Sequence, residues 1–142
     1  MNMTPPRGCQ RVIPYIAYND APAAIEFLRS AFGFEERFRM PMPDGRVGHC
    51  EMGYEDNVLM LASAYPEIGL SSPMDLPSIS AQIVCYVDDV DTHFARAKEA
   101  GATITTEPAD MPYGDRSYRA MDPEGHRWIF STVVSQASPE HA

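Results

Sequence analysis

The sequence predicts an α+β fold built from two tandem copies of one module, each with the order strand, helix and three further strands. Each half of the chain has an aspartate before an apolar stripe of helical spacing, flanked by runs rich in β-branched and aromatic residues. Three landmark pairs keep the same separation of 68 residues, namely Tyr18 and Tyr86, Asp20 and Asp88, and Gly33 and Gly101. A length of 142 residues suits one domain.

The first module is expected to begin with a strand over 12–18, followed by a helix. Asp20 can accept hydrogen bonds from the backbone N–H groups of the first turn, and Pro22 fits that turn because no amide hydrogen is needed there. Gly33 ends the helix, since glycine adopts the left-handed conformation at no steric cost. The apolar stripe of this helix consists of Ile25, Leu28 and Phe32.

The second module repeats this pattern. A strand is expected over 79–87, followed by a helix that begins at Asp89 or Asp91 and ends at Gly101. His93 lies on this helix and is interpreted as solvent-exposed. The apolar stripe is expected to consist of Val90, Phe94 and Ala97.

Turn motifs and proline content set the remaining boundaries. The PDG motif at 43–45 is typical of a hairpin turn, and the DPEG motif at 122–125 leads into a final strand over 126–134. Three prolines interrupt any periodicity in the segment between the two modules. The predicted organisation is one domain over 11–134, with modules 11–64 and 79–134, a linker over 65–78, and tails at 1–10 and 135–142.

Composition excludes several classes of protein. Twenty acidic residues against 11 basic ones give a net charge of −9, which argues against nucleic-acid binding. This charge favours a cationic ligand, or it serves solubility. No stretch approaches the ~20 apolar residues of a membrane span, and no signal peptide is visible, so a cytoplasmic protein is expected. The cysteines are too few and too far apart for a disulfide framework, namely Cys9, Cys50 and Cys85.

Two βαβββ modules and a DPEGHRW turn before the last strand resemble the vicinal oxygen chelate superfamily. That superfamily includes glyoxalase I, the bleomycin resistance proteins and the extradiol dioxygenases, and the resemblance covers about residues 11–134. It implies that each module curls into half a barrel of mixed sheet, and that the concave faces enclose a central ligand cavity. It also implies a homodimer.

The resemblance further implies four positions for metal ligands, one on the first and one on the last strand of each module. In this sequence they fall on Ile13, Met60, Gln82 and Ile129. Of these side chains only Gln82 offers an oxygen ligand, and one amide does not hold a divalent ion. No metal and no other cofactor is therefore expected, and the resemblance is strongest to the metal-free, bleomycin-resistance-like branch.

Residues that alternate along a strand share a face, so these four positions predict further residues of a ligand-binding surface. Tyr15 shares a strand face with Ile13, and the PYGDR loop is expected to bring Tyr113 and Arg116 to the mouth of the cavity. Arg116 has an alternative role as the surface partner of an aspartate, either Asp110 or Asp115. The predicted ligand-binding residues are Ile13, Tyr15, Met60, Gln82, Tyr113, Arg116 and Ile129.

Two pairs of alternating residues on strands carry further candidate chemistry. His49 and Glu51 face the same side of their strand, and the pair is interpreted as the polar face of that strand. The alternative is a general base oriented by an acid, or part of a metal site. Trp128 is expected to be a core anchor, and His126 is expected to bond to the backbone of the preceding turn.

The favoured function is metal-free binding of a small molecule, such as an antibiotic or another toxic amphipathic compound with cationic or aromatic character. Apolar side chains with an isolated polar anchor are typical of small-molecule pockets. One alternative is a glyoxalase-like lyase or isomerase with a displaced metal site, which would use His49, Glu51 and Gln82. The other is a dimeric accessory protein that binds a metabolite without catalysis. Neither a nucleic acid nor a membrane is expected as a partner.

Overall fold

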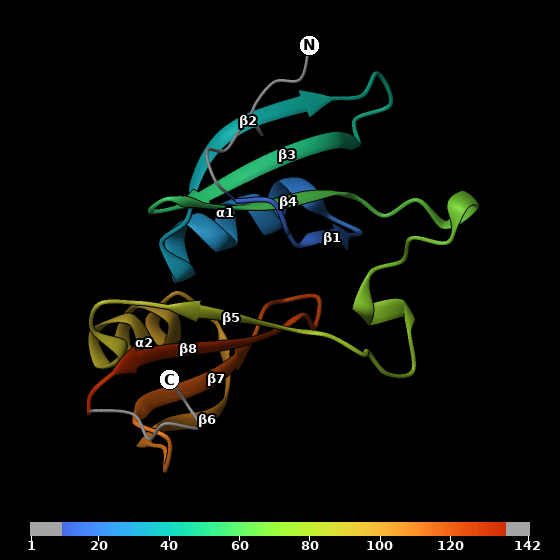
Figure 1. The fold of residues 1–142 in the computed structure, drawn as a ribbon. Helices are drawn as coiled ribbons and strands as arrows, with labels where there is room; N and C mark the ends of the chain where they lie inside the picture. Colours follow the sequence, from blue (N-terminus) through green and yellow to red (C-terminus); the bar gives the residue numbers. More distant parts are fainter. Residues whose placement is uncertain (1–9, 136–142) are drawn as a thin grey trace. The chain divides into compact units, whose positions relative to one another are not determined.

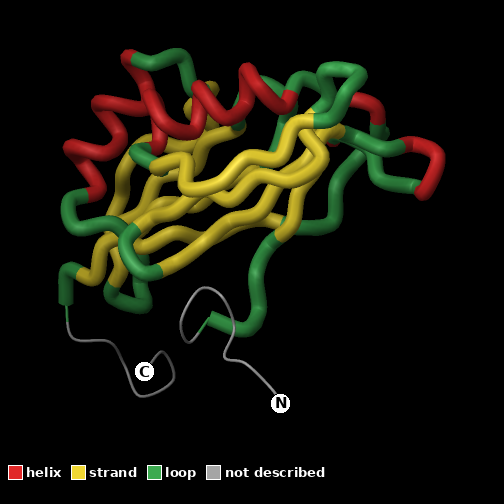
Figure 2. Tube along the Cα trace, turned by 90° about the horizontal axis from the view of Figure 1, so that it is seen from above, coloured by secondary structure: helices red, strands yellow, loops and turns green. Residues whose placement is uncertain are grey.

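The computed structural model describes residues 10–135, and the chain divides into two compact units at the boundary between Ser78 and Ile79. Each unit contains a strand, a helix and three further strands (Figure 1). The strands of each unit form one four-stranded mixed sheet. Figure 2 shows the helices and strands of the described residues in different colours. The predicted α+β fold of two βαβββ modules is confirmed.

The first unit is a sheet with the strand order β1-β4-β3-β2 and one helix packed against it. Strand β1 runs parallel to β4, and the other neighbours are antiparallel. The helix is capped as predicted: the Asp20 carboxylate accepts from the Ala23 N–H at 3.1 Å, and Gly33 has a φ of 82°. The elements are β1 (Tyr15–Tyr18), α1 (Ala21–Phe32), β2 (Glu35–Pro41), β3 (Val47–Tyr54) and β4 (Asn57–Ser63).

Strand β1 is shorter than the predicted 12–18, because it begins only at Tyr15. Pro14 precedes it and has no N–H to give to a sheet ladder, so regular pairing starts after the proline. The Pro14 carbonyl still accepts from the Met60 N–H at 2.9 Å. Ile13 therefore lies before the strand rather than within it.

The core of the first unit lies between α1 and one face of the sheet. Alternate residues of β3 and β4 point to that face, as the twofold period of a strand requires. Cys50 is fully buried there. The other fully buried side chains of this core include Tyr18, Leu28, Phe32, Met52 and Leu61.

The second unit repeats the topology, with the strand order β5-β8-β7-β6 and β5 parallel to β8. Its helix begins after Asp89, whose carboxylate accepts from the N–H groups of Asp91 and Thr92. The elements are β5 (Gln82–Tyr86), α2 (Val90–Glu99), β6 (Thr103–Asp110), β7 (Asp115–Met121) and β8 (Arg127–Val133).

The interpretation of His93 as a solvent-exposed residue is wrong. His93 is 8% exposed and lies on the buried stripe of α2 with Val90 and Ala97. Its Nδ1 lies 2.6 Å from the Tyr118 hydroxyl, and its ring centroid lies 4.3 Å from that of Phe130. A histidine can occupy this core position because the tyrosine supplies a hydrogen-bonding partner.

The DPEG turn is held together by the Asp122 carboxylate. One carboxylate oxygen accepts from the N–H groups of Glu124 and His126, at 3.2 and 3.1 Å. The other accepts from the indole N–H of Trp128 at 3.2 Å. Trp128 is 1% exposed and stacks on Phe130, so the prediction of a core anchor is confirmed.

The segment predicted as the linker, 65–78, contains two short helical turns, η1 (Pro66–Ile68) and η2 (Pro73–Asp75). The backbones of Tyr65 and Leu70 pair with each other and close the loop around η1. No helix among residues 10–135 is long and apolar enough to cross a membrane.

Candidate functional site: a cavity on the first sheet

The face of the first sheet that points away from α1 carries the chemistry of this unit. Sheet register places Tyr15 of β1 beside Met60 of β4, Met60 beside Glu51 of β3, and Glu51 beside Phe38 of β2. These four side chains form one row across the sheet, because residues in register share a face. The neighbouring row contains His49, which pairs with Met40.

Three of these residues form a continuous hydrogen-bonded chain. The Tyr15 hydroxyl lies 2.8 Å from His49 Nδ1, and His49 Nε2 lies 3.0 Å from Glu51 Oε2. An ionised carboxylate can only accept, so Nε2 carries the imidazole proton. When the ring is neutral, Nδ1 is then the acceptor for the Tyr15 O–H. We name Tyr15, His49 and Glu51 the relay.

Exposure increases along the relay from the acid to the phenol. The side chain of Glu51 is 7% exposed and that of His49 is 22% exposed, whereas Tyr15 as a whole is 52% exposed. A buried carboxylate is costly unless a donor compensates its charge, and the His49 N–H does so. Burial raises the pKa of the Tyr15 phenol, with smaller contributions from Cys50 and Glu51, so the hydroxyl keeps its proton at neutral pH.

A cavity of about 470 Å³ adjoins the relay, and Tyr15 is part of its wall. The wall is mainly apolar and is formed by the open face of the sheet, the β2–β3 turn and the loop around η1. One charged group stands in it: Arg46, whose guanidinium lies 4.9 Å from the centroid of the Tyr65 ring and 2.8 Å from Asp44. The lining residues are Tyr15, Met40, Met42, Arg46, Val47, Gly48, Ala62, Ser63, Tyr65, Ile68 and Leu70.

The residues present do not fit the metal that the resemblance implies. Ile13, Met60 and Ile129 supply two aliphatic side chains and one thioether, and none of these binds a hard or borderline divalent ion. Among residues 10–135, no three His, Cys, Asp or Glu side chains gather where they could hold a metal ion. His49 and Glu51 use their facing atoms to bond to each other.

In the second unit, Gln82 and Ile129 lie on the open face of the sheet. Ile129 is in register with Val84 of β5 and with Arg119 of β7. The Gln82 carbonyl oxygen accepts from the Arg119 guanidinium at 3.3 Å. Gln82 therefore has a cationic neighbour that was absent from the predicted set.

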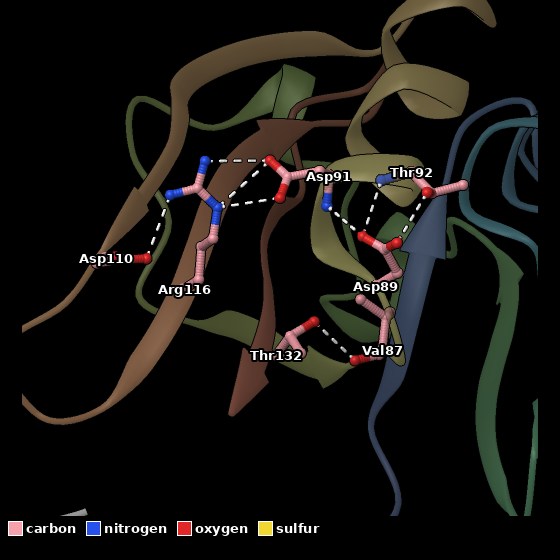
Figure 3. A network of polar contacts seen from close by, with 7 residues as sticks. All are labelled: Val87, Asp89, Asp91, Thr92, Asp110, Arg116 and Thr132. Carbon is pink, nitrogen blue, oxygen red and sulfur yellow. Dashed lines mark hydrogen bonds and ion pairs between the residues drawn. The ribbon is translucent and has the colours of Figure 1, made fainter. Parts of the chain in front are cut away.

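Arg116 and Tyr113 lie at the other end of the second sheet. The Arg116 guanidinium bonds to Asp91 of α2 at 3.1 Å and to Asp110 of β6 at 3.2 Å (Figure 3). The first of these contacts reaches the helix, so Arg116 points to the side of the sheet that carries α2. Its predicted alternative role as the partner of Asp110 matches this contact. Tyr113 lies in the turn before β7 and is 40% exposed.

The structure thus brings Tyr15 and Met60 together in the first unit, and Gln82 and Ile129 together in the second. That all of them line one cavity stays a prediction. Sequence reasoning identified the His49–Glu51 pair but missed its link to Tyr15, because only the sheet register brings Tyr15 within reach of His49. It also missed the cavity walls contributed by the loop around η1, which lies in the segment assigned as a linker.

Comparison with known proteins gives the family. A model of the Glyoxalase/Bleomycin resistance protein/Dioxygenase superfamily matches residues 11–130. An uncharacterized protein of Mycobacterium bovis is 35% identical over 128 residues, which cover 88% of this chain and 84% of that protein. An uncharacterized protein of Mycobacterium tuberculosis has the same identity over 75% of its length.

Solved structures agree with this assignment. TioX from Micromonospora sp. ML1 is 27% identical with a TM-score of 0.70, and the match covers 91% of this chain and all of TioX. The fosfomycin resistance protein FosX from Listeria monocytogenes has a TM-score of 0.65 over 93% of this chain and 96% of FosX, but at 14% identity it supports the fold alone. The chain therefore belongs to the glyoxalase/bleomycin resistance protein/dioxygenase superfamily.

Proposed function

We propose that this chain is a metal-free binding protein, acting in the cytoplasm, that holds a small aromatic or amphipathic compound in the cavity of its first unit. The observation that carries this proposal is the cavity itself: about 470 Å³ of space within the 300–1,000 Å³ range that is usual for small-molecule pockets. Its walls are mainly apolar, with a few polar groups at defined places.

The chemistry of the walls favours an aromatic compound over a cationic one. Met40 and Met42 have flexible thioether side chains, which adapt to flat rings, and Tyr65 offers a ring face. The charged group of the wall is the Arg46 guanidinium, which is paired with Asp44 and offers N–H donors to a neutral or anionic group of a ligand. Toxic aromatic compounds, antibiotics among them, meet this description, and binding alone would keep them from their targets.

A fluorescent probe tests the proposal. N-phenyl-1-naphthylamine is neutral and aromatic, and its emission rises in apolar surroundings. We expect saturable binding to the wild-type protein, and Ala62→Phe should weaken this binding by about tenfold or more, because the new ring occupies the space of the ligand and removes roughly 1.4 kcal/mol of contact.

The matched control is Thr103→Phe, which adds the same ring at an exposed position on β6, outside the cavity. It should leave the affinity for the probe unchanged. The proposal is wrong if the wild-type protein shows no saturable binding, or if Ala62→Phe and Thr103→Phe have equal effects.

A further inference from the structure

The relay behind the cavity has the order of groups found in hydrolytic triads: a buried acid, an imidazole and a hydroxyl at the surface. Glu51 is 5% exposed, and Tyr15 is the member of the relay that lines the cavity. The carboxylate holds the imidazole with Nδ1 directed toward the phenol, at 3.0 and 2.8 Å for the two links. The oxygen of Tyr15 therefore has lone pairs left to accept a hydrogen bond from a ligand in the cavity.

The relay is flanked by side chains of the two neighbouring strands. Its register neighbours on β2 and β4 are Phe38, Met40 and Met60, which carry no titratable group, whereas the Arg37 guanidinium lies over Gly53, two residues beyond Glu51 on the same face of β3. The ring centroid of Phe38 lies 6.1 Å from that of His49. Glu51 is buried and lies in hydrogen-bond contact with the imidazole, so it is placed to pair with the ring when the ring takes up a proton.

We propose that the relay is a general-base site that removes a proton from the acidic O–H of a phenol or enol bound in the cavity. This inference rests on the proposed function, since it uses the same cavity. The ligand proton passes to the Tyr15 oxygen, while the Tyr15 proton passes to His49 Nδ1. The products are a bound phenolate or enolate and an imidazolium paired with Glu51, so protons and charge balance without a further reactant.

The two-step transfer follows from the properties of Tyr15. Its hydroxyl keeps its proton at neutral pH, so it takes up a ligand proton only when it passes its own to His49. Tyr15 is the residue that touches the ligand, and His49 and Glu51 act through it. Arg46, which lies in the wall of the same cavity and is paired with Asp44, offers N–H donors to a ligand anion.

The class of ligand follows from the acidity that proton transfer near neutral pH requires. General acid–base transfer is most effective when the pKa of the reacting group lies near the working pH. Phenols with electron-withdrawing groups and enols of aromatic ketones fall closest to this range among weak acids with a flat ring. The apolar walls formed by Met42, Ile68 and Leu70 suit that ring.

The test uses 4-nitrophenol, whose ionised form is yellow and whose neutral form is not. Its absorbance is recorded against pH with saturating protein, which gives the pH at which half of the bound probe is ionised. In the wild-type protein we expect this midpoint to lie at least one pH unit below that of the free probe, a tenfold shift in the ionisation equilibrium. In Glu51→Gln and Tyr15→Phe the midpoint should rise by about one unit or more.

The matched control is Tyr54→Phe, which makes the same change on β3, where Tyr54 packs against Phe34 outside the cavity. It should keep the wild-type midpoint. Two relay variants are used so that the failure of one to fold, seen by circular dichroism, leaves the other informative. Arg46→Met tests whether the lowered midpoint comes from the relay or from attraction between the bound anion and the charge of Arg46.

The outcomes are distinct. If 4-nitrophenol stays neutral when it is bound to the wild-type protein, the proposal that the relay is a general base is wrong. It is also wrong if the midpoint moves in Arg46→Met but not in Glu51→Gln or Tyr15→Phe. In either case the proposed function stands, provided that N-phenyl-1-naphthylamine binds as described. Failure of both probes to bind overturns the proposed function together with the relay.

Discussion

Glu51 shows how one residue takes its role from the register of a sheet. On an open strand face a glutamate next to a histidine would be solvated and of little consequence. Here Met60 and Phe38 flank it on either side, and it is 5% exposed. Its charge is therefore compensated by His49, and through His49 it affects the Tyr15 hydroxyl at the cavity.

Cys50, on the opposite face from His49, should lower the stability of the protein at alkaline pH. Burial raises the pKa of its thiol from 9.0 to about 11. Deprotonation is then easier in the unfolded chain, so the free energy of unfolding falls once the pH passes the unfolded value of 9.0 and continues to fall until about 11. Below pH 9.0 this effect is absent.

We predict that the loss of stability between pH 8.5 and 10.5 is smaller in Cys50→Ala than in the wild-type protein by about 2 kcal/mol. Urea unfolding at both pH values measures this difference. The destabilisation caused by the smaller side chain is the same at each pH, so it cancels when the two losses are compared. Equal losses in the two proteins would show that the thiol does not titrate in this range.

At the scale of elements, the turn before β8 depends on a single buried carboxylate. Asp122 is 3% exposed and accepts from two backbone N–H groups and from the Trp128 indole. Asp122→Ala leaves these buried donors without their acceptor, so we predict a loss of about 2–4 kcal/mol in the free energy of unfolding.

The chain's one tryptophan reports on this turn directly. Trp128 fluorescence in native Asp122→Ala should shift to longer wavelength, because water reaches the indole N–H. Asp122→Asn keeps an oxygen acceptor and should lie between wild type and Asp122→Ala in both measurements. If Asp122→Ala had the same stability and the same emission wavelength as the wild-type protein, this account of the turn would be wrong.

Element ends were predictable because their signals are local. Asp20 and Gly33 bound α1 through hydrogen bonds and dihedral preferences that reach only a few residues along the chain. The His49–Glu51 pair was visible in the sequence, but its link to Tyr15 was not, because Tyr15 and His49 are 34 residues apart and meet only through pairing with β4. The burial of His93 likewise depends on Tyr118, 25 residues away.

At the scale of the whole molecule, we predict a homodimer. Large apolar side chains on the open face of the second sheet are half exposed, with 55% for Val84, 51% for Tyr86 and 59% for Val133. A patch of this kind is usually covered by a ligand or a partner. Analytical ultracentrifugation at micromolar concentration should give twice the chain mass of 15.8 kDa.

Val84→Lys and Val133→Lys should shift this equilibrium toward the monomer, because a buried lysine without a partner is costly. Lys98→Ala, on the exposed side of α2, is the control and should leave the mass unchanged. A single species of 15.8 kDa, independent of dilution, would rule out the dimer.

The central claim is that a small aromatic compound binds in the cavity of the first unit, and methionine methyl resonances test it most directly. With methyl-¹³C methionine, the methyl groups of Met40 and Met42 report from the cavity wall, and that of Met52 reports from the core behind the sheet. Resonances are assigned by single substitution of each methionine with leucine. On addition of N-phenyl-1-naphthylamine we predict saturable shifts at Met40 and Met42, caused by the ring current of the probe, and a much smaller shift at Met52. Saturable binding with unmoved resonances at Met40 and Met42 would contradict the claim.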